Sequence, residues 1–503
     1  MDRSSWPAAM CREQRVESLV KKTRDGLGVD RINTRTLSID RVEGPRLNAI
    51  EYIGDGHGNI RMMGIARVAG ATQMSTGVYS YSYRRAGSKD WLTFGDYDSV
   101  NDLGLNPVAV DAARDVVYGF KKKDGRWAAY EVALNGSGQE SIVYADPKVD
   151  VKGFLRVGRS RRVVGVRYTT DSEQIHYIDP VYERMRASLA KALPGSGKIL
   201  IVDASADENR LLLLAASDID PGTYYLFDRQ SKQMSKVMDV RPDIAKSALG
   251  VMKAISYRAA DGTAIPAYIS LPPNAGDKKL PAIVMPHGGP ESRDEWGFDW
   301  LAQFFVSRGY AVIQPQFRGS AGYGDEWLMK NGFQSWRTAI NDINDAGRWA
   351  ISEGIADPGK IAVVGWSYGG YAALQSAVVD PSLFKGVIAI APVTDFYQLK
   401  EERRNWTNFR IVSDYIGSGP HIVDGSPAQN ASRIKAPVLL FHGDLDRNVR
   451  SAQSRLMDSR LASAGVAHEY VQFPKLDHYL EDSAAREQML RKSDEFLRKA
   501  MGM

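Results

Sequence analysis

The stretch Ile361-Ala-Val-Val-Gly-Trp-Ser-Tyr-Gly-Gly-Tyr-Ala-Ala-Leu374 decides the fold of this chain. Its first four residues form an apolar run typical of a buried strand, and its small residues at the end predict a helix. Gly365 and Gly369 permit a sharp turn and a close approach of that helix, which forces Ser367 into a strained position with its hydroxyl exposed. We therefore interpret the stretch as a strand, a nucleophile turn and a helix, with Ser367 as the nucleophile.

A serine hydroxyl becomes a useful nucleophile only when a base and an acid converge on it. In folds built around such a nucleophile turn, the serine comes first along the chain, the acid second and the histidine third. Of the seven histidines, only the last three suit that order: His442, His468 and His478. His478 follows a strand-like run, and the loops after strand ends are where an open α/β sheet places its chemistry. The sequence therefore predicts His478 as the general base rather than as a structural histidine.

Two aspartates compete for the role of the acid within the segment His442–Val449. Asp444 directly follows an apolar run and could cap the next turn. Asp446 lies further out, where it could reach a histidine on a neighbouring strand. Both could instead be ordinary turn residues. The pattern by itself leaves these readings open.

A candidate oxyanion hole follows the strand-like run Pro281–Pro286. The next residues, His287-Gly-Gly-Pro290, include two glycines that leave a backbone N–H free to turn toward a reacting carbonyl. The second donor is predicted to be the backbone N–H of Tyr368, the residue after the nucleophile. His287 is expected to hold the loop in place rather than to move protons.

Together these segments resemble the prolyl oligopeptidase family, nearest to its acylaminoacyl and dipeptidyl peptidases. The resemblance runs from about Ile255 to the C-terminus and rests on four motifs, at 365–371, 287–290, 317–324 and 442–449. It implies that the acid is Asp446, the last aspartate of the His-Gly-x-x-Asp motif. It also implies that Gly289 joins the Tyr368 amide in the oxyanion hole.

The resemblance further suggests a specificity pocket. Family members line it from the segment after Ala-Pro-Val and from the valine after the acid. Here these positions are Val393, Phe396 and Val449, beside the ring of Tyr368. Ordinary core packing explains three apolar residues equally well, since apolar side chains are mostly buried.

The composition is that of a globular protein, with 44% hydrophobic and 25% charged residues, and 503 residues predict two or three domains. The net charge of +5 does not indicate a nucleic-acid partner. The basic runs at 121–123 and 159–162 are interpreted as solvated turns, and no recognition motif accompanies them. No run is long enough for a membrane span, and residues 1–6 lack an apolar signal core.

Nothing in the sequence indicates a metal or a cofactor. The single cysteine, Cys11, excludes an internal disulfide framework and a multi-cysteine zinc site. The segment Gly195–Lys198 superficially resembles a phosphate loop. It lacks the upstream glycine, and Ile199 stands where Ser or Thr would bind Mg²⁺. We therefore expect neither a metal nor a cofactor.

The N-terminal half has short strand-like runs in pairs: 61–68 with 78–84, 115–120 with 126–134, 161–168 with 174–179, and 210–216 with 223–228. The last three pairs begin at Asp115, Arg161 and Arg210, which are 46 and 49 residues apart. That period suits four-stranded propeller blades, and a β-sandwich with accidental spacing is the alternative. A helix over Val181–Leu193 is expected to interrupt the third unit.

The resembled family carries seven or eight blades before its hydrolase domain. The roughly 245 residues available here hold about five at this period. We therefore expect an incomplete propeller-like domain over 1–245, and the α/β-hydrolase domain over 246–503, with the boundary near 240–250. An incomplete ring leaves strand edges unpaired, which favours homo-oligomers.

Beyond the boundary, a predicted hairpin at 252–271 precedes apolar strands that alternate with helices. The strands are expected at 282–285, 311–314, 361–364, 387–391, 438–441 and 470–473. Ala339–Ser352 reads as an amphipathic helix. The alternation predicts a mostly parallel, doubly wound sheet covered on both faces.

The sequence thus predicts a serine peptidase that cleaves short peptides through an acyl-enzyme. A carboxylesterase with the same triad is one alternative, and a silent propeller scaffold is another, against which the intact triad argues. A dipeptidyl peptidase should show a paired-glutamate helix, and only Glu173 and Glu183 lie near the predicted helix, which favours an acylaminoacyl or oligopeptidase type. The chain as it stands predicts a cytoplasmic protein, or a periplasmic or secreted one if a signal segment precedes it.

Overall fold

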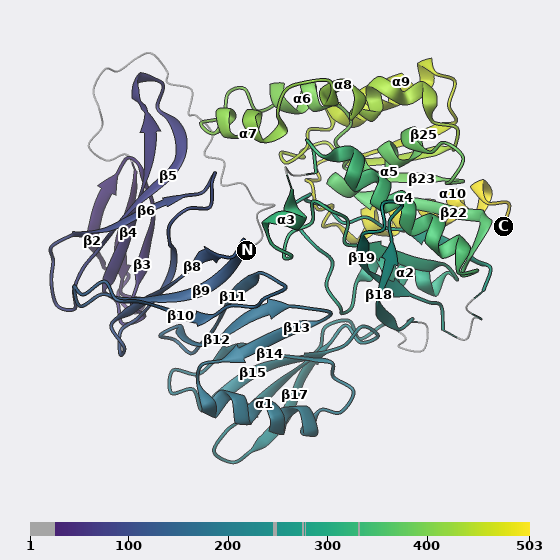
Figure 1. Ribbon diagram of the computed structural model, residues 1–503. Helices are drawn as coiled ribbons and strands as arrows, with labels where there is room; N and C mark the ends of the chain where they lie inside the picture. Colours follow the sequence, from purple (N-terminus) through teal and green to yellow (C-terminus); the bar gives the residue numbers. More distant parts are fainter. Residues whose placement is uncertain (1–25, 245–248, 274–275, 277, 330–331) are drawn as a thin grey trace.

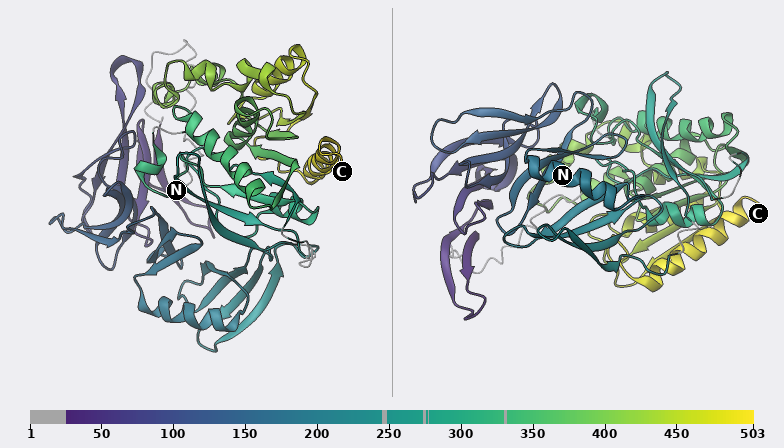
Figure 2. Two further views of the ribbon diagram at one scale, coloured as in Figure 1. Left: turned by 45° about the vertical axis from the view of Figure 1, so that its right-hand side comes forward. Right: turned by 90° about the horizontal axis from the view of Figure 1, so that it is seen from below.

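The computed structural model describes residues 26–244, 249–273, 276, 278–329 and 332–503 (Figure 1). Cys11 and part of the expected domain boundary, 245–248, lie outside the described residues. An all-β region precedes an α/β region in the chain, and the two lie side by side in both views of Figure 2. This is the predicted order of fold classes.

Within the described ranges, the α/β region is built on one eight-stranded sheet of order β18-β19-β21-β20-β22-β23-β24-β25. The pairs β18–β19 and β19–β21 are antiparallel, and every later pair is parallel. The sheet is therefore the mostly parallel one that the sequence predicts. The strands are β18 (Met252–Arg258), β19 (Ala264–Ser270), β20 (Leu280–Val284), β21 (Ala311–Pro315), β22 (Ala356–Trp366), β23 (Val387–Ile390), β24 (Val438–Gly443) and β25 (His468–Phe473).

Helices cover both faces of this sheet because its central strands are apolar on both sides. Along β22, Ile361 and Val363 point into one hydrophobic core, and Ala362 and Val364 point into the other. The first core is closed by α4 (Trp336–Ser352), α5 (Tyr368–Val379) and α9 (Ala452–Ser463), and the second by α2 (Trp300–Ser307) and α10 (Ser483–Ala500). The amphipathic helix predicted to begin at Ala339 begins three residues earlier, at Trp336.

Shorter helices lie in the connections. They are α3 (Asp325–Leu328) after β21, and α6 (Phe396–Glu401), α7 (Phe409–Ile416), α8 (His421–Asp424) and a 3-10 segment (Pro427–Arg433) between β23 and β24. The helices α6, α7 and α8 of the long β23–β24 connection lie at the top of Figure 1, where α7 reaches β5 of the β-region.

In the described part of the β-region, small antiparallel sheets follow one another along the chain. They are β1 (Leu27–Ile32) with β2 (Ile39–Arg46); β3 (Ala49–Gly54), β4 (Ile60–Ala69), β5 (Met74–Tyr83) and β6 (Leu92–Asp98); β7 (Asn106–Asp111), β8 (Val116–Lys123), β9 (Arg126–Ala133) and β10 (Glu140–Tyr144); β11 (Val151–Val157), β12 (Arg162–Thr169) and β13 (Glu173–Tyr177); and β14 (Lys198–Ala204), β15 (Arg210–Ala216), β16 (Thr223–Asp228) and β17 (Gln233–Asp239). A short 3-10 turn (Gly70–Thr72) joins β4 to β5.

These sheets form an arc, from the purple β1–β2 pair to the teal β14–β17 sheet (Figure 1). The arrangement is that of successive propeller blades, as the repeat predicts, and not of two facing sheets. The four predicted strand pairs coincide with β4–β5, β8–β9, β12–β13 and β15–β16. The predicted helical insertion is α1 (Pro180–Ala192).

The arc and the α/β region are joined by backbone hydrogen bonds. Ser75 donates to the Thr407 carbonyl at 3.0 Å, Asp150 to Gly322 at 3.0 Å, and Asp325 to Gly125 at 2.8 Å. The acceptors and donors on the α/β side come from loops after strands β21 and β23. Among the residues described, no helix is both long and apolar enough to cross a membrane.

Candidate active site

Ser367 occupies the turn between β22 and α5, with φ 60° and ψ −120°. This conformation is strained for a residue with a side chain, and the surrounding packing maintains it. A Cβ on Gly365 would lie 2.1 Å from the Gly369 carbonyl oxygen, and one on Gly369 would lie 2.2 Å from the Pro286 oxygen. Both positions therefore accept only glycine, which is why the sequence pattern reads so clearly as this turn.

Asp446 and His478 meet although 32 residues separate them. His478 Nδ1 lies 2.6 Å from Asp446 Oδ2, and both side chains are buried. Asp446 lies in the loop after β24, and His478 lies in the loop after β25. Because these two strands are parallel neighbours, both loops lie at the same edge of the sheet. Asp446 Oδ1 accepts the backbone N–H groups of Asn448 at 2.8 Å and Val449 at 2.9 Å, so the carboxylate is fixed on both sides.

This environment sets the charge of Asp446. Burial by itself would raise the pKa of the carboxyl, but hydrogen bonds from His442 and His478 outweigh burial and lower the pKa to about 2. The group is therefore an anion at neutral pH, suited to orient an imidazole and to stabilise its protonated form.

Asp444 faces a different partner. Its carboxylate accepts the Lys475 backbone N–H at 2.6 Å, which ties the β24 loop to the loop that carries His478. The structure thus brings Asp446, and not Asp444, to the histidine ring.

His442 is a residue whose part in this site the sequence did not reveal. It is fully buried, with Nδ1 2.7 Å from Ser454 Oγ and Nε2 3.1 Å from Asp446 Oδ2 and 2.9 Å from the Val449 carbonyl. Its ring therefore contacts the Asp446 carboxylate and helps to hold it in place. The motif His-Gly-x-x-Asp places it four residues before the acid, which is the signal that could have identified it.

The glycine-rich loop after β20 lies against the nucleophile turn. A Cβ on Gly288 would sit 3.6 Å from Ser367 Cβ, and Gly289 adopts φ 126°, a region that favours glycine. Tyr368 is the first residue of α5, so its backbone N–H has no acceptor within the helix. These are the two groups expected to hold an oxyanion.

His287 is placed as a structural residue. Its ring stacks on Phe317 with centroids 4.4 Å apart, and Nε2 lies 2.8 Å from Ser320 Oγ. Burial lowers its pKa to about 4, so the imidazole is neutral at physiological pH.

Ser367 and His478 open into one cleft of about 640 Å³. The predicted pocket residues Val393 and Val449 line it, together with the Tyr368 ring. Phe396 does not. It is completely buried, with its ring edge-on to Phe333 at 5.1 Å, so core packing accounts for this residue.

Further apolar walls of the cleft come from the β23–β24 connection and from the loop before α4, which the sequence did not indicate. They are Phe333, Leu399, Trp406, Val412, Tyr415 and Ile416. Three arginines, Arg403, Arg447 and Arg486, also line the cleft, against one carboxylate, Glu291.

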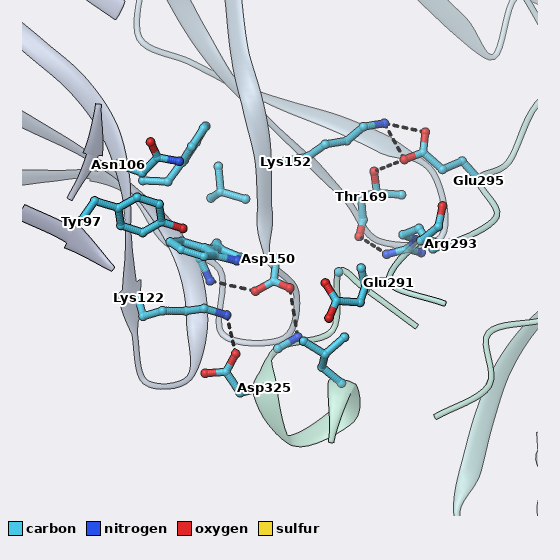
Figure 3. A pocket seen from close by; sticks show the side chains of 18 residues that line it. Tyr97, Asn106, Lys122, Asp150, Lys152, Thr169, Glu291, Arg293, Glu295 and Asp325 are labelled. Carbon is cyan, nitrogen blue, oxygen red and sulfur yellow. Dashed lines mark hydrogen bonds and ion pairs between the residues drawn. The ribbon is translucent and has the colours of Figure 1, made fainter. Parts of the chain in front are cut away.

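A second cavity of about 270 Å³ lies between the arc and the α/β region (Figure 3). It shares Glu291 and Ser292 with the first cleft, so the two spaces adjoin at this loop. Lys152 Nζ binds Glu295 Oε1 across the domain interface at 2.5 Å, and Lys122 pairs with Asp325. The wall between the domains is therefore polar and ion-paired.

The glutamates considered as an anchor for a substrate amino group are not free for it. Glu173 is nearly buried beside Arg167, Lys152 and Lys198. Glu183 lies in the first turn of α1 and lines neither cavity. Within the described residues, no cluster of three or more His, Cys, Asp or Glu side chains is placed to hold a metal.

Comparison with known proteins finds similar sequences and structures. Residues 296–503 match the model of the prolyl oligopeptidase family. Dipeptidyl aminopeptidase BIII of Pseudoxanthomonas mexicana is 27% identical over 414 residues, 78% of this chain and 59% of that protein. The acylamino-acid-releasing enzyme of Mus musculus is 27% identical over 221 residues, 42% of this chain and 30% of that protein. The matched part of the chain spans 59% of the length of the first relative and 30% of the second, less than two thirds in both cases.

Solved structures share the fold of both regions together. A Mycobacterium tuberculosis puromycin-hydrolyzing peptidase superposes with a TM-score of 0.71 at 19% identity, over 92% of this chain and 71% of that one. An acylaminoacyl peptidase of Pyrococcus horikoshii gives 0.67 at 19% identity, over 93% of this chain and 73% of that one. The arc followed by an α/β hydrolase is thus a known architecture.

Proposed function

Because residues 296–503 match the model of the prolyl oligopeptidase family, we propose that this chain is a serine peptidase acting through Ser367, Asp446 and His478. The observation that carries the proposal is the 2.6 Å contact between His478 and Asp446, in a cleft that also holds the strained Ser367 turn.

In this proposal the Ser367 Oγ attacks the peptide carbonyl while His478 takes its proton. The backbone N–H groups of Gly289 and Tyr368 hold the oxyanion. The C–N bond then breaks as His478 returns the proton to the leaving amine. Water, deprotonated by the same imidazole, attacks the acyl-enzyme and releases the acid product and free Ser367. Asp446 stays ionised throughout and stabilises the imidazolium.

The apolar part of the cleft suggests where the substrate binds. Val393, Val449 and Tyr368 all line it. We assign these residues to the pocket for the side chain on the acyl side of the scissile bond. We leave Phe396 out of the pocket.

We further propose an acylaminoacyl- or oligopeptidase-like preference for short peptides. The reason is that Glu173 is engaged by basic side chains and Glu183 lines neither cavity, so neither serves a free amino terminus. The relative Dipeptidyl aminopeptidase BIII favours the alternative, release of dipeptides from a free amino end. A carboxylesterase would use the same residues, since a triad does not distinguish an ester from an amide.

A fluorophosphonate probe tests the nucleophile. We expect it to label the wild-type chain at Ser367, and the label to disappear in Ser367→Ala. The matched control is Ser292→Ala, a second serine lining the same cleft, in which the label must remain. A label that survives Ser367→Ala rejects the assignment.

Peptide profiling tests the substrate class. The same short sequences, offered with free and with N-acetylated amino ends and as the corresponding esters, separate the alternatives. Faster cleavage of acetylated peptides supports the acylaminoacyl reading. Cleavage confined to free amino ends supports dipeptide release, and hydrolysis of the esters alone supports an esterase.

A further inference from the structure

Arg403 stands out among the residues that line the cleft, because it is a cation among largely apolar neighbours. It follows the end of α6, four residues after Leu399, and both side chains line the cleft with Val393. Its guanidinium lies against the Trp406 ring, 4.4 Å from the centroid. The positive charge is thus part of the wall that the substrate side chain meets.

The guanidinium also reaches the triad loop. Arg403 Nη2 donates to the Asn448 carbonyl at 2.5 Å, next to the cleft residue Val449 and two residues from Asp446. One N–H group is used in this way, and a guanidinium has five.

No salt bridge joins Arg403 to a carboxylate among the described residues, although the carboxylates of Glu402 and Asp446 are near enough to stabilise its charge. The adjacent Glu402 directs its carboxylate elsewhere, accepting Gln398 Nε2 at 3.1 Å, and Arg404, one residue further, pairs with Glu401 on the surface. Burial lowers the pKa of Arg403, and the nearby carboxylates of Glu402 and Asp446 oppose that change without cancelling it. An anion entering the cleft would relieve that cost.

The other two arginines of the cleft differ. Arg486 donates to the carbonyls of Leu480 at 3.0 Å and Tyr479 at 3.1 Å, which makes it a loop support. Arg447 is exposed to solvent, where a charge is screened. Arg403 is therefore the cation best placed to distinguish substrates.

We propose that Arg403 is a specificity-determining residue that selects peptides with a carboxylate side chain, aspartate or glutamate, on the acyl side of the scissile bond. The inference rests on the proposed peptidase function and names its substrate class. The apolar walls accept the methylene groups of such a side chain, and the guanidinium accepts its charge through charge-assisted hydrogen bonds.

Glutamate and glutamine at that position make a matched pair of substrates, because they differ in charge and not in size. The experiment measures kcat/KM for Ala-Glu and Ala-Gln p-nitroanilides with free and acetylated amino ends. A charged hydrogen bond of about 1.5–3 kcal/mol corresponds to a preference for glutamate of about 10- to 100-fold. Equal rates for the two in the wild-type chain overturn the proposal without any variant.

Variants separate recognition from loop support. In Arg403→Gln, we expect glutamate cleavage to fall to the glutamine level while glutamine cleavage is retained. Arg403→Lys should keep part of the preference, and Arg403→Glu should favour lysine over glutamate. Arg404→Gln is the matched control, since its partner Glu401 lies outside the cleft lining, and it should leave the ratio unchanged. An equal loss for both substrates in Arg403→Gln indicates a merely structural role and overturns the inference.

Fluorophosphonate labelling of each variant keeps the two proposals apart. A labelled protein that cleaves glutamate and glutamine peptides equally retains the peptidase and loses the selectivity. An unlabelled wild-type protein that cleaves neither peptide rejects the peptidase, and this inference with it.

Discussion

The two regions of this molecule differ in how completely helices cover their strands. In the hydrolase domain, helices cover both faces of the sheet, and most apolar side chains of the central strands β20, β22 and β24 pack into one of two cores. In the arc, the first pair β1–β2 is mostly exposed, as is β17 in the last sheet. One region is closed by its own packing, and the other presents apolar groups at both of its ends.

This difference indicates which region can hold catalytic residues in a fixed geometry. A strained turn such as that of Ser367 persists only where the surrounding structure holds it, and the hydrolase sheet provides that support. The arc instead lies opposite the hydrolase loop Glu291–Glu295, and the two together bound the second cavity beside the site. Changes in the hydrolase domain should therefore alter the chemistry, whereas changes at the ends of the arc should alter association.

The largest expected effect lies at the nucleophile and its base. Ser367→Ala and His478→Ala should each lower kcat by about 10³-fold or more, and the double variant should be scarcely worse, because the residues act as a unit. Single-turnover and steady-state kinetics on the preferred peptide measure this. Additive losses in the double variant would mean that the two residues act independently and that the triad is misassigned.

The two aspartates of the β24 loop give a sharper contrast within one region. Asp446→Asn should lower kcat by about 10²- to 10³-fold, since the imidazolium loses its counter-charge and the tautomer is altered. Asp444→Asn should have a small effect, because its oxygen contacts the Lys475 backbone and not His478. The ratio of the two kcat values is the measurement, and the reverse ranking would contradict the assignment.

Buried His287 provides a pH dependence that belongs to the hydrolase domain. Its pKa is lowered from about 6.5 unfolded to about 4 by burial. The unfolded state therefore binds the extra proton first as the pH falls. The contribution of neutral His287 to the free energy of unfolding is therefore complete above pH 6.5. As the pH falls to 4, the free energy of unfolding decreases progressively by about 3 kcal/mol.

Urea unfolding followed through this pH window measures the slope. His287→Gln, which keeps a hydrogen-bonding side chain without the titrating ring, should flatten it. An unchanged slope in the variant would show that other groups govern acid sensitivity.

The hydrolase domain was predictable because its chemistry constrains single residues. Gly365 and Gly369 admit no side chain, and the chain order of serine, acid and histidine left few choices. Even so, spacing alone did not separate Asp444 from Asp446, since both follow the same strand. The resemblance favoured Asp446, and the contact with His478 agrees with it.

Other parts of the site depend on long-range packing that no local pattern encodes. Phe396 looked like a pocket residue, but its ring turns into the core beside Phe333 and Tyr371. No sequence pattern identifies Arg403 as a cleft residue, because a charged side chain in a polar segment usually faces solvent. In the arc, the repeat identified the paired strands, but a period cannot say which blade ends lie exposed.

The smallest effects are expected at the two ends of the arc, and they concern association rather than catalysis. Ile32 and Ile39 at the first pair are 55% and 62% exposed, and Val237 and Met238 on β17 are 53% and 57% exposed. Exposed apolar strand edges favour pairing with a second copy. We therefore expect concentration-dependent oligomers in light scattering, reduced by Ile39→Lys combined with Met238→Lys, with kcat unchanged. A monodisperse monomer at every concentration would contradict this expectation and would remove the contrast between the two regions.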